Sequence, residues 1–382
     1  MKVTFPHMGT LWIAAKAILE DLGLEVVIPP RPTRETMTLG VRHAPEFACL
    51  PLKVNVGNYI EAFERGAEAI VMAGGVGPCR FGYYAQVERE ILDDLGFPYR
   101  MIVLEPPKGH LSDLINEIKD FTGQRSLIRI YRAVRLGLEK LAALDAVERR
   151  AGYVRAEEAD KGATSRAAQK AMALIDRAAL VGDIRAARGR GLELLEEVPR
   201  RPDQRPLRVG LVGEVYMLLE PSVNLDIERQ LGEMGVAVER HVYLNDWVRS
   251  HLALDFLRMD HEREMRRAAE PYLRHWVGGH GLETIGNAVL YARRGFDGAI
   301  QVAPLTCMPE IVARSLLPVV SQDVDLPVLT LFLDEHSGEA GVRTRLEAFV
   351  DLLTRRRERK RPGDNERVQS GETRLEVIGD QR

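Results

Sequence analysis

The chain has 382 residues, of which 45% are hydrophobic and 29% are charged, the balance of a globular protein. This length exceeds one ordinary hydrophobic core, so two domains are expected. The net charge of −3 argues against a protein devoted to nucleic acid. No run of 18 apolar residues argues for a membrane span, and the N-terminal segment lacks the features of a signal peptide. We therefore expect a cytoplasmic protein.

The first 110 residues predict an α/β domain. Apolar segments typical of strands lie at 2–6, 24–28, 68–73 and 99–104, and segments of helical periodicity lie at 11–22 and 85–95. Gly23 is the expected stop of the first helix. Strands that alternate with helices favour a parallel, doubly wound sheet.

Residues 111–206 predict a helical insert that ends in a linker. Leu, Ala, Arg and Glu recur with helical spacing, and we expect helices near 112–120, 127–148, 165–178 and 180–197. The segment 199–206 is rich in proline and arginine, which is typical of a linker.

A second α/β domain is expected over residues 207–353. Strands are predicted at 207–212, 236–241, 297–302 and 327–333, with helices near 222–234 and 341–356. Residues 354–382 are highly charged and are expected to form a flexible tail. Its basic run at 355–357 is better explained by a solvated helix end than by RNA binding.

The two α/β segments repeat each other, and the repeat aligns two cysteines. The motif GAEAIV at 66–71 precedes Cys79, which lies 13 residues after Gly66. The motif GFDGAI at 295–300 precedes Cys307, which lies 12 residues after Gly295. Both cysteines should follow a strand and precede a helix, where α/β sheets bind ligands and helix N-termini stabilise thiolates. The fold class is therefore α/β, with two similar doubly wound Rossmann-like domains, parallel sheets and a helical insert.

Each of the three cysteines has a proline beside it. Cys49 and Cys307 share a Cys-x-Pro pattern with Pro51 and Pro309, and Cys79 follows a proline. Cysteines in a chain of this kind are metal ligands, redox thiols or core residues. Because all three lie in segments punctuated by Gly and Pro, we favour metal or cluster binding. The absence of C-x-x-C pairs disfavours zinc, and soft thiolates also select copper(I) or iron–sulfur clusters.

Several polar residues and glycines flank the cysteines. Lys53 and Arg80 are candidate positive neighbours of an anionic cluster, or ordinary surface charges. Gly77, with Gly74 and Gly75, would let backbone N–H groups approach a cluster, or would simply form a turn.

Other polar residues lie at expected strand or helix ends. Glu214 is a candidate acid or base, or a helix cap. His280, in the motif GGHG, is a candidate proton donor, or a structural or exposed histidine. The segment 334–336 could transfer protons or fix its loop by capping the helix at 341, and the second role is favoured slightly.

These motifs resemble those of the 2-hydroxyacyl-CoA dehydratase and benzoyl-CoA reductase component family, which includes double-cubane cluster proteins and activase-related proteins. The matching motifs are ACLPLK at 48–53, GPCRFGYY at 77–84, GEVY at 213–216, GGHG at 278–281, CMPE at 307–310 and DEHSGEAG at 334–341. The resemblance as a whole extends over residues 1–353. The similarity is greatest to the activase-related branch, for which no substrate can be carried over.

The resemblance implies a cofactor and a partner. Cys49, Cys79 and Cys307 would bind a [4Fe–4S] cluster, or half of a double-cubane [8Fe–9S] cluster shared by a homodimer or by a heterodimer with a related subunit. An ATP-hydrolysing iron–sulfur activator would supply a low-potential electron. The chain has no G-x-x-x-x-G-K-[ST] motif, so the ATPase would be a separate protein.

Three functions remain open from the sequence. The first is an oxygen-sensitive iron–sulfur reductase or dehydratase component that works under anaerobic conditions. The second is a non-catalytic electron-transfer or cluster-carrier subunit, and the third is a two-domain binding protein with incidental cysteines.

Overall fold

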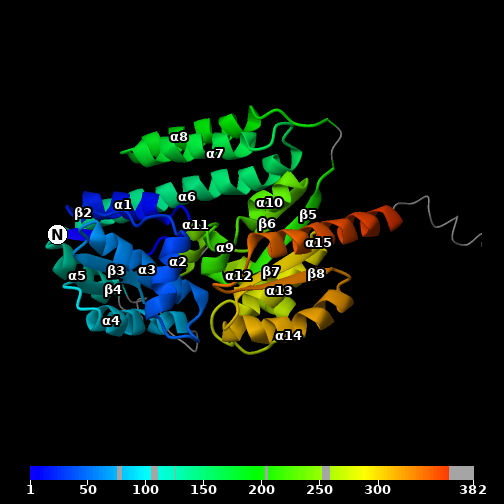
Figure 1. Cartoon of the computed structure of the whole chain (residues 1–382). Helices are drawn as coiled ribbons and strands as arrows, with labels where there is room; N and C mark the ends of the chain where they lie inside the picture. Colours follow the sequence, from blue (N-terminus) through cyan, green and yellow to red (C-terminus); the bar gives the residue numbers. More distant parts are fainter. Residues whose placement is uncertain (75–79, 105–110, 125, 203–204, 252–258, 361–382) are drawn as a thin grey trace, which may run out of the picture.

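The computed structural model describes residues 1–74, 80–104, 111–124, 126–202, 205–251 and 259–360. It contains two four-stranded parallel sheets, with helices on their faces, and this confirms the predicted α/β class with two Rossmann-like domains. Figure 1 shows the first domain at one end of the molecule and the second at the other. No described helix is long and apolar enough to cross a membrane.

The first sheet has the strand order β2-β1-β3-β4. Its strands are β1 (Lys2–Thr4), β2 (Glu25–Val26), β3 (Ala69–Ala73) and β4 (Arg100–Leu104). Its helices are α1 (Leu11–Asp21), α2 (Arg34–His43), α3 (Leu50–Glu64) and α4 (Tyr84–Asp94), which the short 3₁₀ helix η1 (Arg80–Tyr83) precedes. The sequence did not predict α2 or α3. Twelve of the fifteen residues of α3 are buried, polar ones included, so it lacks the one-sided apolar period by which a helix is recognised.

The second sheet has the equivalent order β6-β5-β7-β8. Its strands are β5 (Leu207–Gly213), β6 (Val236–Arg240), β7 (Gly298–Pro304) and β8 (Val328–Leu333). Its helices are α9 (Val215–Leu219), α10 (Ile227–Glu233), α11 (Leu244–His251), α12 (Met259–Ala269), α13 (Gly281–Arg293), α14 (Met308–Asp323) and α15 (Glu339–Arg359). The sheets match strand for strand, which confirms the internal repeat.

Two boundaries in the second domain differ from the prediction. The helix expected at 222–234 is shorter, because Leu225 and Asp226 adopt positive φ values just before α10. Helix α15 continues through the boundary expected at residue 353 and ends at Arg359. Arg357 of its basic run pairs with Asp297 at 2.6 Å, so these charges are tied to the domain.

The helical insert spans both domains. It comprises α5 (Leu111–Thr122), α6 (Leu127–Glu157), α7 (Ala163–Arg177) and α8 (Val181–Glu196). Helix α6 ends at Glu157, nine residues beyond its predicted end at 148. It contacts α1 of the first domain and α10, α11 and β6 of the second. Figure 1 shows α6, α7 and α8 as a layer along one side of the molecule.

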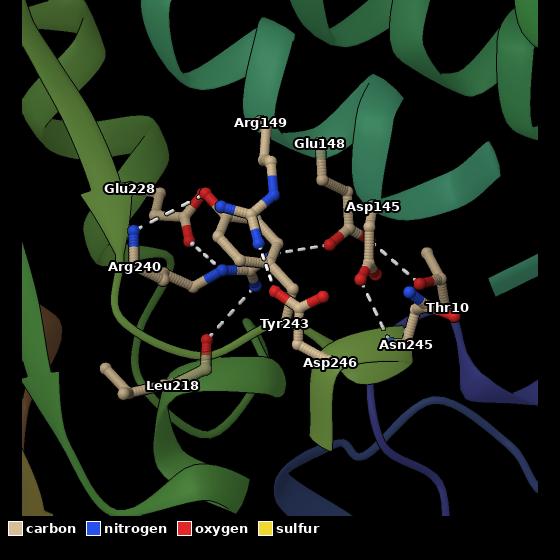
Figure 2. Close-up of polar contacts among 10 residues, drawn as sticks. All are labelled: Thr10, Asp145, Glu148, Arg149, Leu218, Glu228, Arg240, Tyr243, Asn245 and Asp246. Carbon is tan, nitrogen blue, oxygen red and sulfur yellow. Dashed lines mark hydrogen bonds and ion pairs between the residues drawn. The ribbon is translucent and has the colours of Figure 1, made fainter. Parts of the chain in front are cut away.

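A buried arginine anchors α6 to the second domain (Figure 2). Arg240, at the end of β6, is 5% exposed and forms ion pairs with Glu148 of α6 and Glu228 of α10. One of its Nη atoms donates to the carbonyl of Leu218 at 3.3 Å, and its guanidinium lies 4.4 Å from the ring centre of Tyr243. Removing this cation would leave two carboxylates without their partner.

The same network reaches the first domain. Thr10, just before α1, donates its hydroxyl to Glu148 at 2.8 Å. Asp145 of α6 accepts from the backbone of Asn245 at 3.0 Å. Helix α6 thus holds both domains through side chains on two successive turns.

We predict that Arg240→Met destabilises the protein by about 3–5 kcal/mol, because Glu148 and Glu228 lose their buried counter-charge. Urea-induced unfolding will measure the free energy of unfolding. The control is Arg343→Met, which breaks the exposed pair with Glu347 on α15 and should change stability by less than about 0.5 kcal/mol. Equal effects of the two substitutions would contradict the role given to Arg240.

Candidate functional site

Cys49 and Cys307 occupy the same position at the starts of two helices. Cys49 is the N-cap residue of α3 and Cys307 that of α14, and both have extended backbone angles. Pro51 and Pro309 then lie in the first turn, where the missing N–H of proline leaves no hydrogen bond unmade. The shared Cys-x-Pro pattern is therefore a helix start that places a thiol at the positive end of each helix.

The two cysteines are buried to a similar degree, but different elements precede them in the chain. Cys49 is 8% exposed and Cys307 is 9% exposed. Cys307 follows β7 and donates its backbone N–H to Pro304 at 3.0 Å, as the repeat predicts. Cys49 instead follows the loop after α2, so it has no strand of its own.

The third cysteine segment lies outside the described residues. Cys79 and Gly77 both fall in the stretch 75–79, between the end of β3 at Ala73 and the start of η1 at Arg80. Arg80 is placed as the first residue of η1, but its side chain is not described. Their predicted roles stay predictions.

The two tyrosines at the start of α4 have separate surroundings. Tyr84 is buried, and its hydroxyl forms a hydrogen bond with Sγ of Cys49. Tyr83 is 61% exposed. Tyr84 therefore ties the start of α4 to the start of α3, and through it the Cys49 thiol is linked to the helix that follows the Cys79 segment.

Lys53 is a buried contact between the domains and not a surface charge. It is 3% exposed, and its Nζ lies 2.6 Å from Oε1 of Glu335. Burial acts to raise the pKa of Glu335, but the hydrogen bond and charge of Lys53 outweigh it and hold that pKa below its ordinary value. Glu335 follows β8, the strand beside β7, which leads to Cys307.

Apolar packing supports the same arrangement. Leu50 and Val54 of α3 belong to one buried cluster with Val215 and Met217 of α9. The first turn of α3, which Cys49 caps, therefore packs against the second domain at the carboxyl ends of its strands. This places the Cys49 and Cys307 helix starts on facing domains.

Glu214 lies where the sequence predicted, at the carboxyl end of β5. It is the N-cap residue of α9, and its carboxylate accepts from the backbone N–H groups of Tyr216 at 3.1 Å and Met217 at 2.9 Å. Burial nevertheless raises its pKa to about 7, against the effect of these two bonds. The capping geometry is present, and the carboxyl group is also poised to exchange a proton near neutral pH.

Glu310 is a second buried acid, which was named from the sequence only within the motif CMPE at 307–310. It lies in the first turn of α14, and its carboxyl group accepts from Thr284 at 3.0 Å and from Gln301 at 2.8 Å. Burial raises its pKa to about 8, and the nearby charges of Glu214 and Glu283 add to the increase. Burial therefore favours the neutral form of Glu310. The only signal in the sequence was its place three residues after Cys307.

The first domain contains a counterpart of this acid. Glu88, in α4, is fully buried, and Nδ2 of Asn55 in α3 donates to it at 3.2 Å. Burial raises its pKa to about 8. Because α3 and α4 correspond to α13 and α14 in the repeat, each domain buries one carboxyl group between the same two helices.

His280 is the N-cap residue of α13, but its side chain caps no backbone N–H. Its ring is half-buried and lies 6.0 Å from the ring of His241, edge to face. A Cβ on Gly281 would come within 2.5 Å of the carbonyl oxygen of Pro309, so only glycine allows α13 to start this close to α14. His280 therefore borders the helix start that Cys307 caps.

The loop after β8 is fixed by its own side chains. Asp334 accepts from the backbone N–H of His336 at 3.0 Å and from the hydroxyl of Ser337 at 2.8 Å. These bonds form a turn that fixes the loop, but the N-cap residue of α15 is Gly338, which has no capping side chain, so the predicted helix cap is wrong.

Comparison with known proteins gives no family for the chain: no family model and no curated protein matches it. Within the described part of the chain, which leaves out Cys79, no three His, Cys, Asp or Glu side chains group as metal ligands would.

We predict that Glu310→Gln changes how stability depends on pH. The folded-state pKa of about 8 lies above the ordinary value of 4.5, so the stabilisation from neutral Glu310 is complete below pH 4.5 and is lost as the pH rises toward 8. A glutamine stays neutral throughout, so the variant should gain roughly 3–5 kcal/mol relative to the wild type between pH 4.5 and 8. Urea unfolding across this range will measure the difference.

The control for this experiment is Glu347→Gln, which alters an exposed carboxylate on α15. It should follow the pH dependence of the wild type. Parallel curves for wild type and Glu310→Gln would show that Glu310 ionises normally.

Proposed function

We propose that the chain is an iron–sulfur protein of the 2-hydroxyacyl-CoA dehydratase and benzoyl-CoA reductase component family, and that it works in the cytoplasm. Cys49, Cys79 and Cys307 would hold a [4Fe–4S] cluster, or one half of a double-cubane cluster shared with a second copy or a related subunit. The observation that carries the proposal is the shared position of Cys49 and Cys307, each capping a helix on facing domains.

The chemistry of the donors suits such a cluster. Thiolates are stabilised by helix N-termini, and both described cysteines have that setting. Soft sulfur donors bind iron–sulfur clusters, whose potential depends on net charge and solvent access. The low exposure of both cysteines would keep solvent away from the cluster.

The resemblance of the sequence suggests a low-potential reductase or dehydratase component. When bound, the cluster would accept an electron from a separate ATP-hydrolysing activator and supply it for reduction of an acyl-CoA substrate. The residues of this chain would bind and orient that substrate, and they would donate protons to it or accept protons from it. Glu214 is the candidate acid, since its carboxyl group has a pKa near 7 at the end of β5. His280, at the start of α13, is the second candidate.

One observation favours an alternative function, that of an electron-transfer or cluster-carrier subunit. Cys49 and Cys307 are both more than nine-tenths buried, and Tyr84 lies against Cys49. An enclosed cluster suits electron relay better than direct contact with a substrate. Turnover of acyl-CoA substrates with activator and ATP would favour the enzyme, and electron delivery to another protein without turnover would favour the carrier.

We predict that the anaerobically reconstituted protein binds about four irons per chain, as expected for three thiolates on one cubane. Cys49→Ala, Cys79→Ala and Cys307→Ala should each lose most of this iron and the corresponding electron paramagnetic resonance signal of the reduced protein. Iron and sulfide quantitation will measure the loss. A variant that keeps full iron content would exclude its cysteine as a ligand.

A matched control tests whether a substitution at any helix N-cap residue releases iron. Ser126 caps α6 through a hydrogen bond to the backbone of Arg129, and Ser126→Ala removes that cap far from the cysteines in the sequence. This variant should keep its iron. A wild-type protein that holds no iron after reconstitution would overturn the proposed function.

A further inference from the structure

A histidine–glutamate pair joins the two domains at the carboxyl end of the first sheet. His7 lies three residues after β1, and its Nδ1 is 2.7 Å from Oε2 of Glu220, the C-cap residue of α9. His7 is 7% exposed and Glu220 is fully buried. In this strand order the chain connections run in opposite directions on either side of the boundary between β1 and β3. The carboxyl ends of these two strands are therefore the switch point of the first sheet, where α/β proteins bind ligands. Neither residue was predicted from the sequence to belong to a site.

Glu220 is held as a carboxylate. Its Oε2 also accepts from the backbone N–H of Gly9 at 2.7 Å, and its Oε1 accepts from that of Ser222 at 3.0 Å. Burial acts to raise the pKa of Glu220, but the hydrogen bond and charge of His7 and these two backbone bonds hold it below the ordinary value. A carboxylate only accepts hydrogen bonds, so Nδ1 of His7 carries the hydrogen and donates it.

The second ring nitrogen of His7 has different surroundings. In the segments that the structure describes, Nε2 has no hydrogen-bond partner, and it is not sealed from solvent. The tautomer that Glu220 imposes leaves the lone pair on Nε2 when the ring is neutral. Nε2 is therefore the nitrogen at which a proton can arrive and leave.

We propose that His7 and Glu220 form a proton-transfer pair at the junction between the domains. His7 gives the proton on Nε2 to the carbonyl oxygen of a bound acyl thioester that has become anionic by taking up one low-potential electron, supplied by the proposed ATP-dependent activator, and Glu220 is the positioning residue that fixes the imidazole. The Nε2–H bond breaks, an O–H bond forms and the imidazolium becomes neutral imidazole, which solvent water reprotonates. The inference rests on the proposed function for the identity of this substrate.

The test is nuclear magnetic resonance of the full chain labelled with ¹⁵N-histidine and free of iron, so that it does not depend on the cluster. In the wild type, His7 should show a downfield proton resonance from Nδ1–H at every pH. A second proton should bind to Nε2 and leave it as the pH changes. Glu220→Gln should weaken the Nδ1–H resonance and populate both tautomers of the neutral ring. His7→Gln assigns the signals, and His275→Gln, at an exposed histidine, should leave them unchanged.

Two results would overturn the proposal. A neutral His7 that keeps its hydrogen on Nε2, or one whose Nε2 never changes protonation, cannot donate as described. Loss of iron in reconstituted His7→Gln would instead make His7 a ligand or a structural support. If the wild type itself holds no iron, the proposed function fails, whereas the resonance experiment still decides whether the pair exists.

Discussion

Two buried contacts, one an ion pair and the other a hydrogen bond to a carboxylate, fix the relation between the domains on which the rest of the structure depends. Lys53 of the first domain pairs with Glu335 of the second, and Glu220 of the second pairs with His7 of the first. Each pair lies at the carboxyl ends of parallel strands. Because buried charges are stable only when they are paired, the two sheets are held with these edges toward each other.

That constraint explains why helix starts gather between the domains. In a parallel sheet, every helix that follows a strand begins at the carboxyl edge, so the positive helix ends share one side. The starts of α9 and α14 therefore lie at this junction, and the start of α3, which follows α2, lies there because its first turns pack against α9. The N-cap residues of α3, α9 and α14 are Cys49, Glu214 and Cys307. The fold supplies a setting that favours thiolates and carboxylates before any ligand is considered.

The sequence predicted the strands and helices that have a regular apolar period, and it did not predict the helix that is buried on all sides. The alternating strands, the repeat and the helical insert follow from local patterns, and the sheet orders confirm them. Helix α3 was not predicted because its polar residues Lys53, Asn55 and Asn58 are buried, whereas polar residues usually lie on the surface. Their partners come from other segments, as with Glu335 for Lys53, and no local pattern encodes such long-range pairs.

The candidate site shows the same division. Cys307 and Glu214 were predicted from their place after strands, whereas His7, Glu88 and Glu310 gain their properties only from the fold. A glutamate in the first turn of a helix is ordinarily a cap, but burial raises the pKa of Glu310 against the effect of the hydrogen bonds from Thr284 and Gln301. Glu88 shows the same effect in the other domain, between the helices that correspond in the repeat.

The recurrence of this acid in both domains bears on its role. A buried carboxyl group destabilises a helix pair relative to an apolar residue of the same size. Two helix pairs related by the repeat carry this destabilising feature through different partners, Asn55 in one and Thr284 in the other. Packing does not require it, because many helix pairs pack with apolar contacts alone. A neutral acid adds no charge repulsion to an anionic group, so the acid in each domain is compatible with the anionic cluster proposed above.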